Sequence, residues 1–201
     1  CRYEAAVVLA PNGKIFFAPS GAGRVLAIDP EASAVEMLGP DLPGAGKYLA
    51  DGVLATNGRI YFPPGSAGRA LAIDPEASTA TLLGQEMPGS EKYRVAGVIA
   101  PNDKIYCAPA CAERVLVIDP AASAVDTLEP PISGEGIRYR VAGILTSNSE
   151  IYFAPAGADR TLVIRPGADA VELVGPDMPG SSKYLSGSPP RPSGRNFSVP
   201  C

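Results

Sequence analysis

The sequence predicts an all-β domain made of four copies of one four-stranded unit. Three observations support this prediction. A segment of about 45 residues recurs four times, each copy holds several short apolar runs separated by turn residues, and no stretch has the apolar spacing of a helix. The 22 glycines and 22 prolines among 201 residues favour turns and leave little room for long helices.

The repeat is marked by an asparagine, an arginine and a tyrosine that recur at the same step. These are Asn12, Asn57, Asn102 and Asn148; Arg24, Arg69, Arg114 and Arg160; and Tyr3, Tyr48, Tyr93, Tyr139 and Tyr184. One residue is inserted in the third linker (GEGIRY against GSEKY). We expect one domain over residues 1–201, with repeats at approximately 5–48, 49–93, 94–139 and 140–184.

Each unit is predicted to contain four short strands. The first is an apolar run such as Val7–Ala10, and the second, KIFFAP or RIYFPP, carries aromatic residues and is stopped by proline. The third, RVLAID, ends at Asp-Pro, and the fourth, AVEML or TATLL, alternates outward and inward residues. A return loop with Pro-Gly and then Lys/Arg-Tyr leads to the next unit.

Four antiparallel strands in this length match the size of one β-propeller blade. A single four-stranded sheet cannot bury both of its faces, whereas blades packed radially bury them and leave only short edges. A linear β-solenoid is the alternative, but its turns are shorter and do not need three tight hairpins per unit. We therefore predict a four-bladed β-propeller.

The units resemble propeller repeats of the YVTN and NHL-like class, through segments such as NGKIFFAPSGAGRVLAIDP. They are also similar to tandem repeats of algae and other protists with the pattern GVLAPNGKIYxxP followed by RVLVIDP. The resemblance covers about residues 3–184 and implies the architecture. It implies no activity, because such propellers serve many functions.

The end of the chain leaves two arrangements open. Residues 193–200, SGRNFSVP, imitate NGRIYFPP, so the tail 185–201 reads as the degenerate start of a fifth repeat. In one arrangement four blades close a ring and Cys1 meets Cys201 in a disulfide, a plan similar to that of hemopexin-type domains, although the hemopexin sequence motifs are absent. In the other, the chain belongs to a five-bladed ring or is a fragment of a longer propeller.

Two cysteines depart from the repeat. Cys107 stands where the other units have phenylalanine, and Cys111 stands in the following turn, where they have glycine or serine. Two alternatives remain open: the two cysteines are free thiols, or they form a short disulfide with each other. A zinc site is not expected, because zinc takes four ligands and the chain has no histidine. Either disulfide would indicate an oxidising compartment, such as the secreted space or an organelle lumen, for instance the thylakoid lumen.

Composition excludes several classes of function. The net charge of −4 without a basic run argues against nucleic acid as a partner. No apolar stretch approaches the roughly 20 residues that span a bilayer, so membrane association is expected only peripherally, through partners. Without histidine, a phosphate-binding glycine loop or a carboxylate pair placed in a cleft, we expect neither an enzyme nor a cofactor.

One face of the propeller collects arginines and tyrosines, the residues most often found at binding hot spots. The candidate partner-binding residues are Arg114, Arg138, Tyr139, Arg140, Arg160, Lys183 and Tyr184. In the alternative interpretation, each arginine pairs with a carboxylate of its own blade and each tyrosine wedges between blades. Recurrence in every unit favours that structural role.

The opposite face carries Asp29, Asp74 and Asp119, with Arg165 at the fourth position. Three aspartates could surround a cation. However, an aspartate before proline commonly caps its own turn, and Arg165 would add a positive charge to the ring. No metal is therefore expected.

These observations favour a non-catalytic scaffold that mediates protein–protein contacts within a larger assembly. The algal resemblance implies an accessory, peripheral subunit of an organellar or photosynthetic membrane complex. The alternative is a ligand-binding propeller, lectin-like or cation-binding, although the absence of tryptophan counts against sugar binding.

Overall fold

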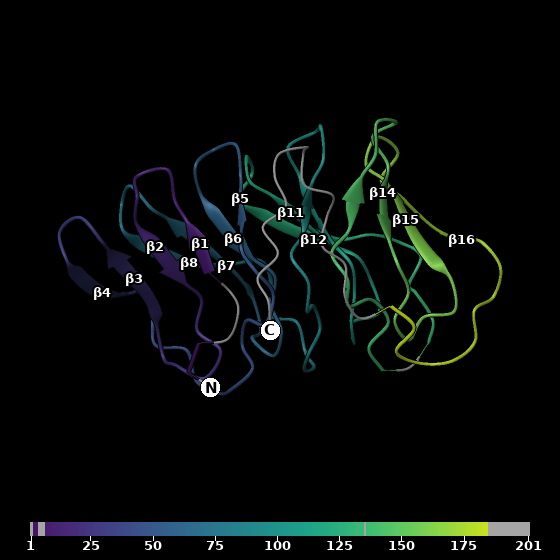
Figure 1. Ribbon diagram of the computed structural model, residues 1–201, viewed down its shortest axis with the longest axis horizontal. Helices are drawn as coiled ribbons and strands as arrows, with labels where there is room; N and C mark the ends of the chain where they lie inside the picture. Colours follow the sequence, from purple (N-terminus) through teal and green to yellow (C-terminus); the bar gives the residue numbers. More distant parts are fainter. Residues whose placement is uncertain (1, 4–6, 135, 185–201) are drawn as a thin grey trace, which may run out of the picture.

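The computed structural model describes residues 2–3, 7–134 and 136–184 of the chain. In these ranges sixteen short strands form four antiparallel sheets, and the strands of each sheet pair in chain order (Figure 1). The described ranges contain no helix, and hence no helix long and apolar enough to cross a membrane. The predicted all-β class is confirmed.

Each sheet is one propeller blade. Blade 1 holds β1 (Val7–Leu9), β2 (Ile15–Phe17), β3 (Val25–Asp29) and β4 (Ala34–Leu38). Blade 2 holds β5 (Val53–Leu54), β6 (Ile60–Phe62), β7 (Ala70–Asp74) and β8 (Thr79–Leu83). Blade 3 holds β9 (Val98–Ile99), β10 (Ile105–Cys107), β11 (Leu116–Asp119) and β12 (Ala124–Thr127). Blade 4 holds β13 (Ile144–Leu145), β14 (Ile151–Phe153), β15 (Thr161–Arg165) and β16 (Ala170–Val174).

The first hairpin of each blade depends on one residue with a positive φ. In the Asn-Gly turns this residue is Gly13 (φ 80°) or Gly58 (φ 79°), and in the other two blades it is Asp103 (φ 60°) or Ser149 (φ 63°). Glycine, aspartate and serine at these positions fit the turn chemistry, because short polar side chains tolerate this conformation better than bulky ones. The repeated turn therefore sets the register of the first two strands in every unit.

The two faces of each sheet bury different side chains. Alternate residues of a strand point to opposite faces. In β6, Ile60 and Phe62 belong to the core shared with blade 1, whereas Tyr61 belongs to the core shared with blade 3. A third core joins blades 3 and 4. Each core is thus completed by two neighbouring blades.

Hydrogen bonds repeat the same neighbour contacts. The hydroxyls of Tyr48, Tyr93 and Tyr139 donate to the backbone carbonyls of Arg69, Arg114 and Arg160, at 3.1, 2.9 and 3.0 Å. The side-chain amides of Asn12, Asn57 and Asn102 donate to the carbonyls of Pro75, Pro120 and Pro166 in the following blade, at 3.0, 3.2 and 3.5 Å. The tyrosine of each return loop therefore belongs structurally to the next blade, as the wedge interpretation expects.

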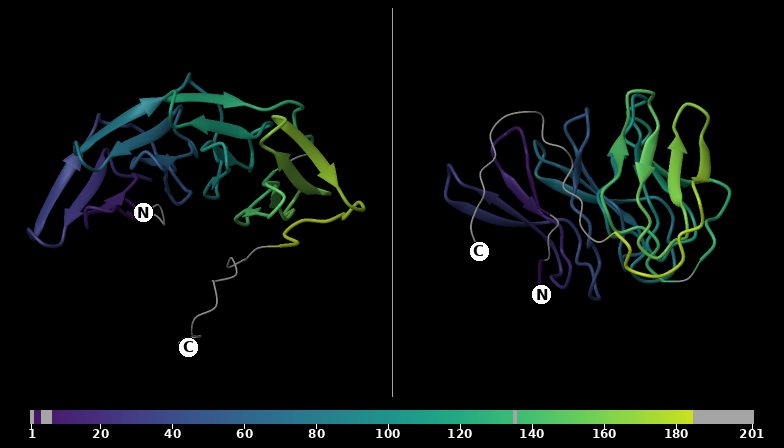
Figure 2. Two further views of the ribbon diagram at one scale, coloured as in Figure 1. Left: turned by 90° about the horizontal axis from the view of Figure 1, so that it is seen from above. Right: turned by 45° about the vertical axis from the view of Figure 1, so that its right-hand side comes forward.

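The four blades lie along an open arc (Figure 2). Blades 1 and 4 stand at its two ends, and none of the three cores contains residues of both. Four propeller blades are confirmed, but within the described residues the expected closure of blade 4 on blade 1 is not formed. The proposed seam between Cys1 and Cys201, and the tail 185–201, lie outside the described residues.

We predict that the tyrosine wedges stabilise the fold and that the last tyrosine does not. Tyr93→Phe removes a hydroxyl that is buried and bonded to the Arg114 carbonyl, so the free energy of unfolding should fall by about 1–2 kcal/mol. Tyr184→Phe is the matched control, because Tyr184 is 50% exposed and should change the free energy little. Urea unfolding measures both, and an equal loss in the two variants would contradict the wedge.

Candidate functional site: the return-loop pockets

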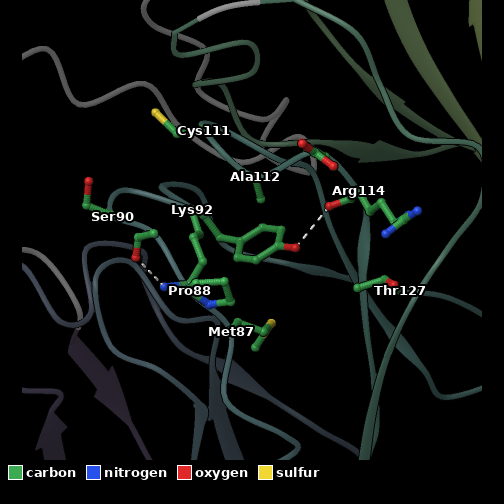
Figure 3. Close-up of a pocket in the computed structure, with 11 residues that line it drawn as sticks. Met87, Pro88, Ser90, Lys92, Cys111, Ala112, Arg114 and Thr127 are labelled. Carbon is green, nitrogen blue, oxygen red and sulfur yellow. Dashed lines mark hydrogen bonds between the residues drawn. The ribbon is translucent and has the colours of Figure 1, made fainter.

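A pocket lies between each pair of neighbouring blades, where the return loop of one blade meets the turn that follows the second strand of the next. The pocket between blades 1 and 2 has a volume of about 330 Å³, that between blades 2 and 3 about 390 Å³, and that between blades 3 and 4 about 250 Å³. We call the second of these the middle pocket (Figure 3). Its lining includes Met87, Pro88, Lys92, Tyr93, Cys111, Ala112, Arg114 and Thr127.

The backbone of the return loop fixes this geometry. The N–H of Lys92 donates to the carbonyl of Gly65 in blade 2, at 3.1 Å, and its own carbonyl accepts the N–H groups of Ala110 and Ala112 in blade 3. The Lys/Arg-Tyr pair at each blade junction makes the same contacts. Because one residue bonds to both blades, the loop walls of each pocket are held in place.

At the three blade junctions the cation before the tyrosine is buried and donates hydrogen bonds to backbone carbonyls. The ammonium of Lys92 donates to the carbonyls of Gly89 and Ala67, both at 2.8 Å. Burial lowers the pKa of Lys92, and likewise that of Lys47. The guanidinium of Arg138 donates to the carbonyls of Gly134 and Ala112. These cations tie loops together and are covered by protein.

The repeated arginines form ion pairs inside their own blades. The closest nitrogen–oxygen distances are 2.9 Å for Arg24–Asp41, 3.8 Å for Arg69–Glu86, 3.0 Å for Arg114–Glu129 and 2.6 Å for Arg160–Asp177. The Arg24 and Arg160 guanidiniums lower the pKa of Asp41 and Asp177. All four pairs remain partly exposed and rim the return-loop face. They match the alternative in which arginine pairs within its blade.

The structure separates the predicted partner-binding residues into three groups. Arg138 and Tyr139 are buried at a blade junction and are not accessible to a partner. Arg114 and Arg160 lie on the pocket rims, and Arg140 is exposed beside another cavity, of about 250 Å³. Lys183 and Tyr184 follow blade 4, and among the described residues no further blade lies against them. The candidates therefore do not form one surface.

Sequence reasoning missed Met87 and Thr127, which line the middle pocket with Arg114. Met87 looks like any apolar residue before Pro-Gly in a return loop. Its position opposite blade 3 depends on how neighbouring loops meet, which no local pattern reports. Cys111 was noticed as a departure from the repeat, but its place in this pocket follows only from the fold (Figure 3).

The two described cysteines are free thiols in different environments. Cys107 is buried in the core between blades 2 and 3, and burial raises its pKa to about 12. Cys111 is exposed. The short disulfide between them, one of the two expected alternatives, is not formed. The Cys107 thiol fills a position that the other units give to phenylalanine.

The aspartates of the opposite face cap their own turns, as the sequence suggested. Asp29, Asp74 and Asp119 accept backbone N–H groups two or three residues further on, at 2.9–3.0 Å. Each also faces a cation of its own blade, such as Arg59, which lies 3.1 Å from Asp74. In blade 4 the charges are exchanged, and Arg165 pairs with Glu150 at 2.7 Å. Within the described residues, no group of carboxylates and thiols could hold a metal ion.

Comparison with solved structures supports the propeller fold. No family model and no curated protein matches the chain. A virginiamycin B lyase from Staphylococcus aureus is similar, with a TM-score of 0.64 and 14% sequence identity over 86% of this chain and 55% of the lyase. An auxiliary nutrient binding protein from Bacteroides ovatus is similar with a TM-score of 0.58 and 12% identity, over 89% of this chain and 44% of that protein.

A hydrazine synthase chain from Kuenenia stuttgartiensis gives a TM-score of 0.57 at 13% identity, over 86% of this chain and 49% of that one. The present chain thus spans about half the length of these three proteins. At these identities the likeness shows the β-propeller fold alone. The resemblance to propeller repeats inferred from the sequence is confirmed at that level.

We predict that the two described thiols differ strongly in reactivity. In a chain with Cys1→Ser and Cys201→Ser, a thiol reagent at pH 8 should modify Cys111 quickly and Cys107 only after unfolding, because thiolate is the reactive form and Cys107 is buried and protonated. Mass spectrometry of the intact and digested protein identifies the modified residue. Protection of both thiols until a reductant is added would contradict this result, since it would indicate the short disulfide.

Proposed function

We propose that this propeller is a non-catalytic scaffold that binds a protein partner on its return-loop face, with the middle pocket as the anchor point. The observation that carries the proposal is the lining of this pocket. Met87 and Pro88 supply an apolar wall on one side, and Arg114 supplies a partly exposed cation on the other (Figure 3). Interfaces are enriched in arginine, methionine and tyrosine at such positions.

The ion pair of Arg114 beside the middle pocket also differs from those of blades 1 and 4. In blades 1 and 4 the Nε of Arg24 and of Arg160 binds the paired carboxylate. In blade 3 the terminal nitrogen of Arg114 makes this contact, at 3.0 Å from Glu129, and the buried Nε has no hydrogen bond. A binding site usually departs from the regular pattern of a repeat, so this irregularity supports the middle pocket as a binding site.

The lining favours a partner segment that offers an apolar side chain beside a carboxylate. The apolar group would cover Met87, whose flexible thioether adapts to different shapes. The carboxylate would take over Arg114 from Glu129, and because exposed ion pairs contribute little to stability, this exchange costs little. The larger setting, an accessory peripheral subunit of an organellar or photosynthetic complex in an oxidising lumen, remains part of the proposal and is supported by the algal resemblance alone.

Selection of peptides from a random displayed library tests the proposal. Peptides that bind the folded chain should be enriched in an apolar residue beside Asp or Glu, and their affinity should fall at least about tenfold in Met87→Asp and in Arg114→Glu, a loss of about 1.4 kcal/mol. Leu42→Asp and Arg69→Glu change the equivalent pocket between blades 1 and 2 and are the matched controls. Equal losses at both pockets, or none at either, would contradict the middle pocket as the anchor.

A ligand-binding propeller is a second candidate, because the pockets recur between blades. Their volumes of about 390 and 330 Å³ fall within the range of small-molecule sites. A ligand recognised by the repeated loop elements would bind more than one pocket of the same chain.

Calorimetric titration with a panel of neutral mono- and disaccharides distinguishes the two candidates. Repeated binding sites predict a stoichiometry above one and a partial loss of sites in each single-pocket variant, Met87→Asp or Leu42→Asp. An absence of heat across the panel would remove the lectin-like alternative.

A further inference from the structure

Blade 1 presents a free apolar face. In blades 2, 3 and 4 the second and third strands turn an apolar set toward the preceding blade, and these side chains are fully buried: Ile60, Phe62, Leu71, Ile73, Ile105, Cys107, Leu116, Ile118, Ile151, Phe153, Leu162 and Ile164. The equivalents in blade 1 are Ile15, Phe17, Leu26 and Ile28, and all four are only partly buried. On the flanking strands of the same face, Leu9 is 65% and Val35 64% exposed.

Blade 4 presents the opposite free face. Ile144 is 47% exposed, whereas its equivalent in blade 3, Val98, packs against the core shared with blade 4. Tyr152 is partly buried, whereas its equivalent Tyr106 is fully buried in that core. Among the described residues, the hydrogen bond from the repeated asparagine to the next blade is also missing in blade 4. Asn102 reaches the Pro166 carbonyl of the next blade, while the amide of Asn148 bonds to Glu150 of its own blade.

These two faces are the two halves of one interface, which the chain already forms three times. At each internal junction, one blade contributes the face that is free in blade 4, and the next blade contributes the face that is free in blade 1. We propose that blade 4 of one copy packs on blade 1 of a second copy, and that two copies close head to tail into an eight-bladed ring. The arc is open to one side, so a second arc related by a half-turn brings both pairs of free faces together (Figure 2).

The Lys/Arg-Tyr pair of a blade junction occurs both before blade 1, as Arg2 and Tyr3, and after blade 4, as Lys183 and Tyr184. In the ring only one of these two pairs can occupy the junction, and the hydrogen bonds indicate which one. Arg2 and Tyr3 already serve blade 1, since the Arg2 carbonyl accepts the N–H groups of Ser20, Gly21 and Ala22 at 2.9–3.1 Å. Lys183 keeps one backbone bond, to the Ala156 carbonyl at 3.2 Å, and Tyr184 is half exposed. In the ring, Lys183 and Tyr184 therefore give way to Arg2 and Tyr3 of the second copy.

The mass of the 201-residue chain in solution tests the proposal. Light scattering after size exclusion should give twice the chain mass of 20.6 kDa at micromolar concentration. Leu9→Asp and Val35→Asp on blade 1, and Ile144→Asp on blade 4, should each give a single chain mass over the same range. Ala121→Asp places the same charge in an exposed turn away from both faces and should stay dimeric. Circular dichroism checks that each variant is folded.

Mixing the variants identifies the geometry. The Leu9→Asp variant has an unchanged blade 4 face, and the Ile144→Asp variant has an unchanged blade 1 face. A mixture of the two monomers should therefore regain the dimer mass, because these two faces can form one junction. A dimer mass retained by Leu9→Asp or by Ile144→Asp alone would indicate that like faces pair, and a mixture that stays monomeric would show that the two faces do not meet. Either result would overturn the proposal. So would a mass that grows without limit with concentration, or a monomer at every concentration, which would assign the faces to residues 185–201 or to a different protein.

Discussion

The structure depends on one constraint: each blade is a single sheet with apolar side chains on both faces. Such a face is buried from water only when another blade packs on it, because a single sheet has no further element that could cover its faces. Burial of a large aliphatic or aromatic side chain contributes about 1.5–3 kcal/mol, so the shared cores outweigh the exposed ion pairs at the rims. The tyrosine wedges and asparagine bridges set the relative position of faces that apolar contact already holds together.

Stability in such a chain is expected to vary with position. Contacts join each blade to its neighbours, as in other repeat proteins, and the internal blades have two such neighbours. In blades 2 and 3 the second strands β6 and β10 are buried throughout, whereas their equivalents in the end blades, β2 and β14, are only partly buried at some positions. The middle pocket lies between the two blades that are held most firmly. A binding site there rests on rigid elements, which keeps its geometry defined.

The sequence predicted the parts of the fold that depend on local chemistry. Asn-Gly and Asp-Pro turns, alternating strands and the 45-residue step were sufficient to predict four sheets of four antiparallel strands each. Arc closure was not predictable in this way, because it depends on small rotations between blades that the packed cores determine. The same limit applies to the site. Arg138 and Arg114 were both candidate partner-binding residues, but Arg138 is buried at a blade junction and Arg114 lies on a pocket rim, because neighbouring loops differ in how closely they approach.

The exchanged charges of blade 4 limit how the repeats can recombine. Arg59 and Asp74 form the pair in blade 2, and Glu150 and Arg165 form it in blade 4 with the signs reversed. A crossover between these two strands would join Glu150 to an aspartate, or Arg59 to an arginine, and place like charges together. A chimaera that joins whole blades therefore keeps each ion pair, whereas one that joins the second strand of blade 4 to the third strand of blade 2 loses it.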